Sequence, residues 1–187
     1  SDVCSSDLVV GGRGDPPFEA DIGIAGGVVS VIGPELPRKN AHRVVDADGL
    51  LAAPGFIDTH SHDDVYLLAE PDGAAKIRQG ITTVVTGNCG LSIAPLLRET
   101  LPQAMESLAI IGSRYLPEAP QNGWSFSDFL RRLEEVRPAL NVIPLVGHGT
   151  LRLAVTGIEA RPVRVDEKRR MATLLEEAME ADRKSVV

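Results

Sequence analysis

The order of strand-like and helix-like segments after residue 54 constrains the fold more than any other feature of the sequence. Short runs rich in apolar and β-branched residues, as in buried strands, lie at 56–62, 81–86 and 142–146. Segments with helical spacing or helix-end signals lie at 74–78, 125–136 and 166–181, with Asp72 and Asp166 as expected caps of the first and last. Strands that alternate with helices are typical of a parallel sheet. The sequence therefore predicts an α/β fold from residue 54 onward.

Residues 9–53 form a different kind of segment, in which short strands alternate with tight turns. Glycine and proline pairs mark the turns, and the runs rich in Ile and Val lie at 22–24, 28–32 and 43–49. This part has too little apolar surface to be stable as a sheet by itself. We expect a small β-unit that packs on a larger body.

The composition excludes several classes of protein. Of the 187 residues, 43% are hydrophobic and 24% are charged, which is typical of a globular domain. The net charge of −7 provides no attraction for nucleic acid, so we expect no such partner. No apolar run approaches the roughly 20 residues that cross a bilayer, and no segment resembles a signal peptide. We therefore expect a cytoplasmic protein without a membrane partner.

Both ends of the chain look foreign to the protein. Residues 3–8 are what the DNA string GTG TGC TCT TCC GAT CT encodes, and residues 182–187 are what GAT CGG AAG AGC GTC GTG encodes. Both strings match the ends of common sequencing adapters. We therefore interpret residues 1–8 and 182–187 as adapter-derived tails, which leaves Cys4 outside the argument. We expect these tails to pack poorly on the body, because they would have no native partner there.

Polar side chains follow each of the three predicted strands, at the end where parallel sheets collect their chemistry. His60 and His62 end the first strand, and the alternation of side chains along a strand predicts that both imidazoles face one side. Two neutral imidazoles on one face suit a divalent metal ion. Asp58 falls on the same side, where its carboxylate would accept a hydrogen bond from a ligand. Ordinary hydrogen-bonded histidines are the alternative.

Four further candidates follow the second and third strands. Cys89 is a candidate third metal ligand because its strand comes next after the His pair, while a buried structural cysteine is the alternative. His148 lies between two glycines, which permit a close approach of the backbone to a ligand. We expect His148, Arg152 and Asn88 to contact substrate, with Arg152 suited to pair with a carboxylate. A solvent-facing Arg152 is equally compatible with the sequence.

Three segments resemble a known family. Residues 53–62, Ala-Pro-Gly-Phe-Ile-Asp-Thr-His-Ser-His, resemble the first-strand signature of the amidohydrolase superfamily. Residues 79–85, followed by Gly-Asn-Cys-Gly at 87–90, narrow the resemblance to the N-acyl-D-amino-acid deacylase (D-aminoacylase) branch. Residues 146–152 are similar to a further segment of that branch. The resemblance extends over residues 9–181.

The resemblance implies the first part of a (β/α)8 metal-dependent hydrolase barrel at 54–181, preceded by part of a small β-sandwich at 9–53. It implies a zinc cofactor, with His60 and His62 in the first-strand ligand positions and Cys89 as the cysteine ligand. In the family, zinc activates a water that hydrolyses a small-molecule N-acyl-D-amino acid to a carboxylate and a D-amino acid. The family's later histidine ligands and its aspartate base have no counterpart here, so the catalytic base is unknown.

Two other interpretations remain open. A cyclic-amide hydrolase of the dihydroorotase or hydantoinase type carries the same first-strand His pair, but typically uses a carboxylated lysine as the bridging ligand. A non-enzymatic metal-binding protein on a truncated scaffold is the other. The Asn-Cys-Gly segment at 88–90 and the segment around His148 favour the deacylase.

Overall fold

The computed structural model describes residues 2–116 and 121–185, and within these residues the chain divides into two compact units. One unit ends at Gly55 and the other begins at Phe56. The division falls in the Pro-Gly segment that separates the two predicted parts. Within the described residues, none of the helices combines the length and the apolar character needed to cross a membrane.

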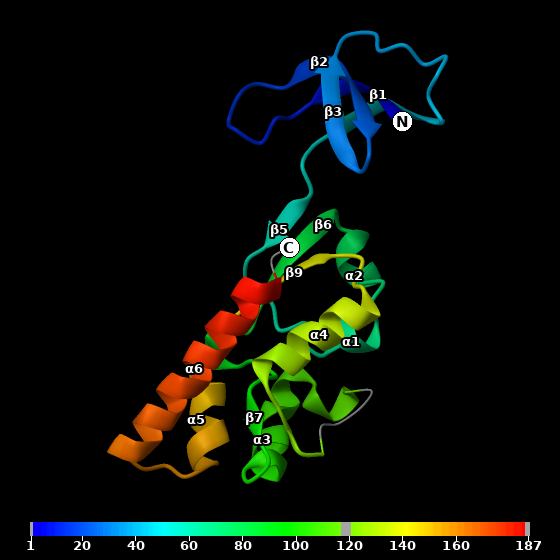
Figure 1. The fold of residues 1–187 in the computed structure, drawn as a ribbon. Helices are drawn as coiled ribbons and strands as arrows, with labels where there is room; N and C mark the ends of the chain where they lie inside the picture. Colours follow the sequence, from blue (N-terminus) through cyan, green and yellow to red (C-terminus); the bar gives the residue numbers. More distant parts are fainter. Residues whose placement is uncertain (1, 117–120, 186–187) are drawn as a thin grey trace. The chain divides into compact units, whose positions relative to one another are not determined.

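The first unit is a β-sheet (Figure 1). Its strands are β1 (Asp2–Val9), β2 (Phe18–Ala25), β3 (Val28–Gly33) and β4 (Arg43–Ala52), in the order β3-β2-β1-β4. β1 runs parallel to β4, and the other neighbours are antiparallel. The β2–β3 hairpin turns at Gly26 and Gly27, which both have positive φ, as a two-residue turn that follows the strand twist requires. The strands expected within residues 9–53 are therefore present.

The first residues of the chain lie inside this sheet, and the expectation that residues 1–8 pack poorly is wrong for residues 2–8. β1 hydrogen-bonds to β2 on one side and to β4 on the other. Val3 and Val9 are only 6% and 3% exposed. A sheet ladder uses backbone groups that every non-proline residue carries, so a foreign segment without proline can complete it. Whether these residues derive from an adapter stays a prediction.

The other expected tail, residues 182–187, continues the last helix as far as Ser185. The side chains of residues 182–185, and residues 186–187 altogether, lie outside the described part of the chain. The expectation that this tail packs poorly therefore stays a prediction.

The first sheet leaves many large apolar side chains in contact with solvent. Val28, Leu50 and Leu51 are more than half exposed, at 63%, 63% and 53%. Monomeric proteins rarely expose apolar surface of this density without a partner for it. The packing of this unit on a larger body therefore stays a prediction that its surface supports.

A parallel sheet forms the centre of the second unit. Its strands are β5 (Phe56–Asp58), β6 (Ile81–Thr86) and β9 (Asn141–Pro144), in the order β5-β6-β9. Both pairings are parallel, as the alternation of strands and helices predicted. The first and third strands are shorter than expected, since they end at Asp58 and Pro144 instead of 62 and 146. The polar residues after both strands therefore lie in loops or at a helix start.

Helices and short turns connect these strands (Figure 1). The α-helices are α1 (Tyr66–Ala69), α2 (Ala74–Ile77), α3 (Leu101–Ser107), α4 (Phe126–Val136), α5 (His148–Thr156) and α6 (Val165–Ser185). The smaller elements are the 3₁₀ turns η1 (Asn88–Gly90), η2 (Leu108–Ile111) and η3 (Ser113–Tyr115) and the strand pair β7 (Leu96–Leu97) and β8 (Gly123–Trp124).

Neither expected cap residue is the N-cap of its helix. The N-cap of α2 is Gly73, although the carboxylate of Asp72 still bonds the first turn. Asp72 accepts a hydrogen bond of 3.3 Å from the backbone nitrogen of Ala74, at the start of α2. Asp166 is not the cap of α6, because that helix already begins at Val165. The carboxylate of Glu167 accepts from the backbone nitrogen of Arg164 instead, at 2.8 Å. It thereby satisfies a donor just before the first helical turn.

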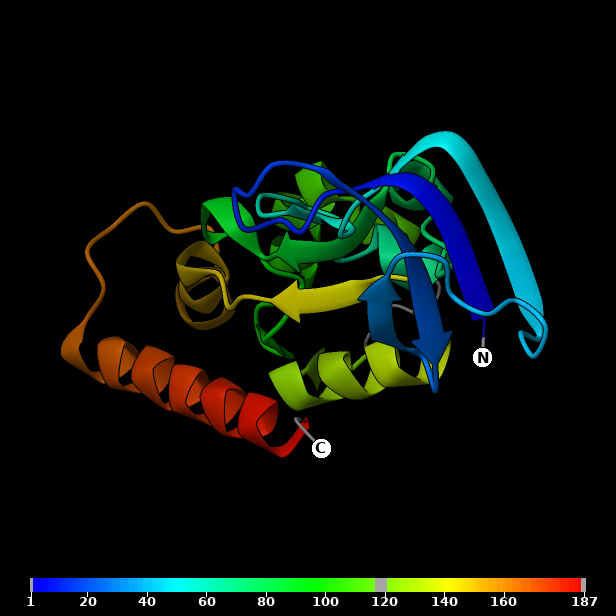
Figure 2. The same cartoon turned by 90° about the horizontal axis from the view of Figure 1, so that it is seen from above.

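The main hydrophobic core lies around α4. Phe129 is fully buried, and its ring centroid lies 6.0 Å from those of Trp124 and Phe126. Helices α4 and α6 pack together, and α5 lies beside α6 (Figure 2). Ile93 and Leu96, in the segment after β6, are also fully buried in this core. The core therefore anchors the chain just beyond the loop that carries Cys89.

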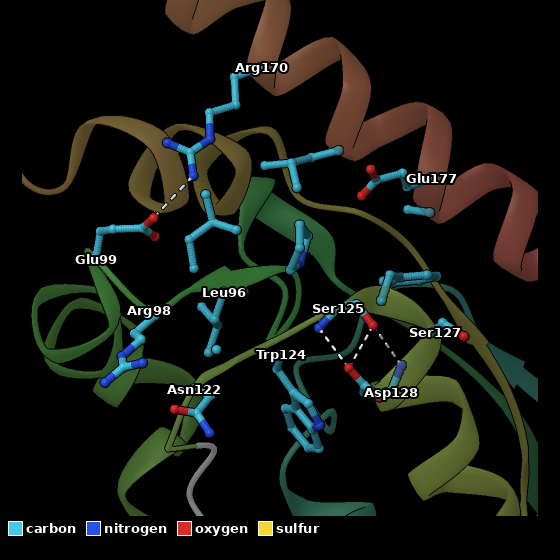
Figure 3. A pocket seen from close by; sticks show the side chains of 16 residues that line it. Leu96, Arg98, Glu99, Asn122, Trp124, Ser125, Ser127, Asp128, Arg170 and Glu177 are labelled. Carbon is cyan, nitrogen blue, oxygen red and sulfur yellow. Dashed lines mark hydrogen bonds and ion pairs between the residues drawn. The ribbon is translucent and has the colours of Figure 1, made fainter.

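A capping box fixes the beginning of α4 (Figure 3). The hydroxyl oxygen of Ser125 accepts from the backbone nitrogen of Asp128 at 3.1 Å, and an Asp128 carboxylate oxygen accepts from the backbone nitrogen of Ser125 at 3.2 Å. Two otherwise unsatisfied donors of the first turn are thus bonded. The cap therefore fixes where α4 begins, directly before the core residues Phe126 and Phe129.

Replacing Ser125 with Ala should lower the free energy of unfolding by about 1 kcal/mol, because the cap loses its acceptor. The measurement is urea unfolding followed by the fluorescence of Trp124, the only tryptophan in the sequence. Ser127→Ala is the matched control, since Ser127 is exposed within the helix, and it should change stability by less than about 0.5 kcal/mol. Equal effects of the two substitutions would show that the capping box contributes nothing.

Candidate metal centre

Two histidines and a cysteine come together just beyond the ends of β5 and β6. The ligand atoms that His60, His62 and Cys89 offer all lie within 4.8 Å of one another. His60 Nε2 lies 3.1 Å from Cys89 Sγ, and the two imidazole centroids lie 5.7 Å apart. The structure thus brings together the three residues that the sequence singled out as metal ligands. That they bind a metal stays a prediction.

The two imidazoles do not converge in the way that we expected. We placed them on one face of a strand that extends to residue 62, but β5 ends at Asp58 and the chain bends after it. Strand alternation therefore cannot account for their positions. The reason lies in the peptide between them, at Ser61.

The backbone nitrogen, carbonyl and hydroxyl of Ser61 all form hydrogen bonds, and the residue is only 4% exposed. Its backbone nitrogen donates to the carbonyl of Val85 at 3.0 Å. Its carbonyl accepts from Asn88 Nδ2 at 3.3 Å, and its hydroxyl donates to Asp63 Oδ2 at 2.5 Å. These bonds fasten the segment after β5 to the end of β6, so the histidines on either side of Ser61 are held beside Cys89.

Cys89 lies in a tight turn that requires glycine at position 87. Gly87 has φ of +78°, and a Cβ atom there would lie 2.2 Å from the carbonyl oxygen of Leu145. The loop after β6 therefore contacts the end of the third strand backbone to backbone. Cys89 itself has φ of +55°, a conformation that costs a non-glycine residue roughly 1 kcal/mol or more. Such strain is common where a side chain must be directed into a functional site.

The glycines beside His148 serve the same close contact. A Cβ atom on Gly147 or Gly149 would lie 2.4 or 2.7 Å from the carbonyl oxygen of Gly90. The close backbone approach that the sequence predicted is therefore real, but the partner that the structure shows is the turn next to Cys89. His148 is exposed at the first position of α5. Its contact with substrate stays a prediction.

Asn88 and Arg152 have structural partners. Asn88 Nδ2 donates to the carbonyls of Val85 and Ser61, at 2.8 and 3.3 Å, and so ties the two strand ends together. Arg152 donates to the carbonyls of Glu159 and Arg161 at 2.8 and 2.6 Å, and so fastens the loop that leads to α6. The expectation that both side chains contact substrate stays a prediction.

The three side chains fit a zinc ion. His62 Nδ1 is buried and has no hydrogen-bond partner among the described residues, so a nitrogen lone pair or proton there is left unsatisfied. In a tetrahedral zinc site, nitrogen and sulfur ligands lie about 3.4–3.6 Å from each other. The 3.1 Å contact and the 4.8 Å limit of the cluster bracket that spacing. Small side-chain rotations would therefore bring the three ligands to one ion.

A lysine forms ion pairs with the carboxylates on either side of the His pair. Lys76 Nζ lies 2.6 Å from Asp58 Oδ2 and 2.9 Å from Asp63 Oδ2. The hydrogen bond from Lys76 lowers the pKa of Asp58 below its ordinary value. Burial opposes the charge on Lys76, but its bonds to the two carboxylates outweigh burial and raise the pKa of the ammonium. Asp58 and Lys76 are therefore both charged at neutral pH.

Asp58 accepts a hydrogen bond from this segment, but not from an imidazole ring. Its Oδ1 accepts from the backbone nitrogen of His60 at 3.2 Å. The carboxylate thus orients the peptide that carries the ligand. A direct hydrogen bond to a ligand side chain stays a prediction.

Asp64 is a buried carboxylate that sequence reasoning missed. It is 1% exposed, and its Oδ2 accepts from the backbone nitrogen of Gly87 at 3.3 Å. Its Oδ1 and the hydroxyl of Thr86 lack hydrogen-bond partners among the described residues. Burial raises the pKa of Asp64 to about 6, against the opposing backbone hydrogen bonds. The available signal was the Asp-Asp pair at 63–64, directly after the second histidine.

A cavity of about 550 Å³ lies elsewhere in the second unit (Figure 3). It is lined by the β7–β8 strands, the start of α4 and the side of α6. Arg170 and Glu99 form an ion pair of 3.5 Å at its edge. Within the described residues, none of the three clustered ligands lines it, so this cavity is separate from the candidate metal centre.

Known proteins are similar in sequence to this chain over most of its length. The model of the amidohydrolase family matches residues 43–184. An N-acyl-D-aspartate deacylase of Alcaligenes xylosoxydans xylosoxydans is 44% identical over 96% of the chain, and a D-aminoacylase of the same organism is 42% identical over 91%. The chain spans only 34% of the length of each of these relatives.

Solved structures share the fold as well. A D-aminoacylase with a binuclear metal centre superposes with a TM-score of 0.84 and is 38% identical over 96% of the chain and 36% of its own length. An N-acyl-D-glutamate deacylase from Bordetella bronchiseptica, complexed with zinc and a phosphonate inhibitor, has a TM-score of 0.80 at 36% identity, with the same coverage of both chains. The chain therefore has the mixed α/β fold of these amidohydrolases.

The buried Asp64 carboxylate should make stability depend on pH. Its folded-state pKa of about 6 exceeds the ordinary value of 3.8, so the folded chain binds the proton more tightly than the unfolded chain. The contribution of Asp64 should therefore be most favourable below pH 4 and should fall, by on the order of 3 kcal/mol, as the pH rises to 6. Asp64→Asn should remove this loss, because the amide carries no charge.

The measurement is urea unfolding of the metal-free parent and the Asp64→Asn variant between pH 4 and 8. The difference in unfolding free energy between them should shift in favour of the variant as the pH rises. Asp15→Asn, which changes an exposed carboxylate, should show no such shift. A difference between parent and Asp64→Asn that stays constant with pH would contradict the assignment.

Proposed function

The chain belongs to the amidohydrolase family, and we propose that it is the N-terminal part of a zinc-dependent hydrolase that cleaves N-acyl-D-amino acids to a carboxylate and a D-amino acid. The names of its relatives support the substrate class, because the deacylases that match act on N-acylated D-amino acids such as aspartate and glutamate. The chain covers about a third of them, so the activity is proposed for the whole protein.

The observation that carries the proposal is the convergence of His60, His62 and Cys89 at the ends of neighbouring parallel strands. The unpartnered buried nitrogen of His62 adds to it, since a metal would satisfy that atom. We propose that these three side chains hold the zinc. When bound, zinc would polarise the amide carbonyl and activate the attacking water.

The chain's own residues would then position the reactants. Cys89 would bind as a thiolate, which zinc favours over the thiol. We propose that His148, exposed beside the Cys89 turn, contacts the substrate, together with Asn88 and Arg152. Asn88 and Arg152 would have to contact the substrate through side-chain atoms other than the nitrogens that now donate to backbone carbonyls. Asp58 would keep the peptide of His60 in place.

We propose that the second unit is the first part of a (β/α)8 barrel, with β5, β6 and β9 as neighbouring strands of it. The parallel pairings and the helical connections support this arrangement. We propose that the sheet of the first unit belongs to a small β-sandwich, which its exposed apolar residues support. A small-molecule substrate would bind at the strand ends, where such barrels place their sites.

The 187-residue chain should be inactive by itself. The described residues provide three strands of the proposed barrel and no candidate for the late-strand base, and an open part of a barrel exposes strand edges that favour aggregation. The measurement is release of D-amino acid from N-acetyl-D-amino acids by the purified, zinc-loaded chain. Zinc-dependent turnover by this chain alone would contradict the expectation.

In the full-length protein, Cys89→Ala should remove most of the tightly bound zinc and nearly all turnover, while the fold survives. His60→Ala and His62→Ala should weaken zinc binding or abolish turnover. Ser127→Ala is the control, because Ser127 is exposed in α4 and lies outside the ligand cluster. It should leave zinc content and rate unchanged.

Zinc content by elemental analysis and hydrolysis of N-acetyl-D-amino acids are measured together. A cyclic amide such as dihydroorotate or a hydantoin serves as the competing substrate. Full zinc content and near-parent rate in Cys89→Ala would make Cys89 a structural residue. Preference for the cyclic amide would show instead that the protein belongs with the cyclic-amide hydrolases.

A further inference from the structure

We propose that Lys76 is a positioning residue of the metal centre, which holds the carboxylates of Asp58 and Asp63 away from the metal and fixes the peptide between His60 and His62. This inference rests on the proposed function, because it assumes that the two histidines bind metal. Asp58 and Asp63, the two carboxylates that Lys76 contacts, are not members of the ligand cluster found among the described residues.

The geometry places one ammonium between two carboxylates that bracket the ligands in sequence. Lys76 Nζ contacts Asp58 Oδ2 at 2.6 Å and Asp63 Oδ2 at 2.9 Å. The three side chains are similarly shielded, at 21%, 24% and 20% exposure. Charge pairs at this depth are more strongly coupled than pairs on an open surface. Lys76 thus connects the residue two before His60 to the residue directly after His62.

Each carboxylate also holds the ligand segment through a second bond. Asp58 accepts from the backbone nitrogen of His60 at 3.2 Å. Asp63 accepts from the hydroxyl of Ser61 at 2.5 Å, and its own backbone nitrogen donates to that hydroxyl at 3.2 Å. Lys76 therefore acts on both histidines through their neighbours, without contacting either imidazole.

The position of Lys76 is itself fixed. It lies in α2, where its backbone nitrogen donates to the carbonyl of Gly73 at 2.9 Å. A Cβ atom on Gly73 would lie 3.0 Å from Leu140, so α2 packs tightly at its beginning. Leu140 belongs to the apolar cluster that also contains Val84 of β6. The Lys76 ammonium therefore extends from α2, a helix whose beginning packs on the apolar cluster that includes Val84 of β6.

Without Lys76, the Oδ2 atoms of Asp58 and Asp63 would lose their cation, and we expect these oxygens then to compete as metal ligands. Carboxylate oxygens are hard ligands that suit manganese or magnesium, whereas imidazole and thiolate suit zinc and cobalt. By pairing with both Oδ2 atoms, Lys76 leaves His60, His62 and Cys89 as the ligands that the metal meets. It thereby favours zinc-like ions in addition to orienting the ligands.

The test uses Co²⁺ as the probe, with the 187-residue chain kept reduced. Tetrahedral cobalt absorbs in the visible, and a thiolate ligand adds a charge-transfer band, so the spectrum reports both geometry and the Cys89 bond. Dissociation constants for Co²⁺ and Mn²⁺ are measured by titration against a chromophoric chelator. Far-ultraviolet circular dichroism and Trp124 fluorescence report whether each variant is folded.

The variants are Lys76→Met, which removes the charge, and Lys76→Arg, which keeps it. Arg78→Met is the matched control, because Arg78 is an exposed cation at the end of the same helix. Lys76→Met should weaken Co²⁺ binding by roughly 10–100-fold, as loss of an outer partner of a ligand typically does. It should also alter the visible spectrum and shift preference towards Mn²⁺. Lys76→Arg should recover most of the affinity, and Arg78→Met should behave as the parent.

A folded Lys76→Met variant with the parent's Co²⁺ affinity, spectrum and preference over Mn²⁺ would overturn the inference. If that variant does not fold, Lys76→Gln, which keeps a donor but not the charge, is judged by the same criteria. Failure of the parent chain to bind Co²⁺ with a thiolate band would overturn the metal centre itself, and with it this inference. Binding by the parent with no effect of Lys76 would overturn the role of Lys76 alone.

Discussion

The candidate site depends on the hydrogen bonds that fasten the peptide at Ser61 to the end of β6. β5 is short, and by itself it would leave the two histidines on a loose connection. The bond from Ser61 to Val85 continues the alignment of β5 and β6 past the point where the strand ends. The two hydrogen bonds from Asn88 Nδ2, to the carbonyls of Ser61 and Val85, hold the same two segments together. Because the peptide is held on both sides, the imidazoles next to it have few conformations left, which lowers the entropy lost on binding a metal.

Close backbone packing brings Cys89, the third candidate ligand, to the same place. Gly87, Gly90 and Gly147 allow the turn after β6 to contact the end of β9 and the start of α5 without intervening side chains. The turn then has little freedom, and Cys89 keeps its left-handed conformation within it. Asp64 stabilises this turn, because its carboxylate accepts a hydrogen bond from the backbone nitrogen of Gly87. The carboxylate is costly to bury, and its raised pKa of about 6 shows the electrostatic consequence of that position.

Three charged side chains, Lys76, Asp58 and Asp63, form a cluster next to the candidate ligands. Lys76 and its two carboxylates bind the ligand segment from the side of α2, while His60 and Cys89 remain exposed. An exposed ligand pair on an anchored backbone is what a site needs if a metal and a small substrate are to enter from solvent. Among the described residues, none of these three charged side chains lines the cavity beside α4 and α6.

The sequence by itself determined the alternation of strands and helices, the parallel sheet and the identity of the three clustered residues. These follow from local patterns: β-branched runs, helical spacing, and polar residues where strands end. It did not determine where β5 stops, that residues 2–8 join the first sheet, or that Asp166 lies inside α6. The ion pairs of Lys76 and the burial of Asp64 were likewise decided only in the tertiary structure. Each of these depends on partners distant in sequence, such as Val85 for Ser61 or Gly87 for Asp64, and hydrogen bonds and burial between distant residues leave no periodic signal in the chain.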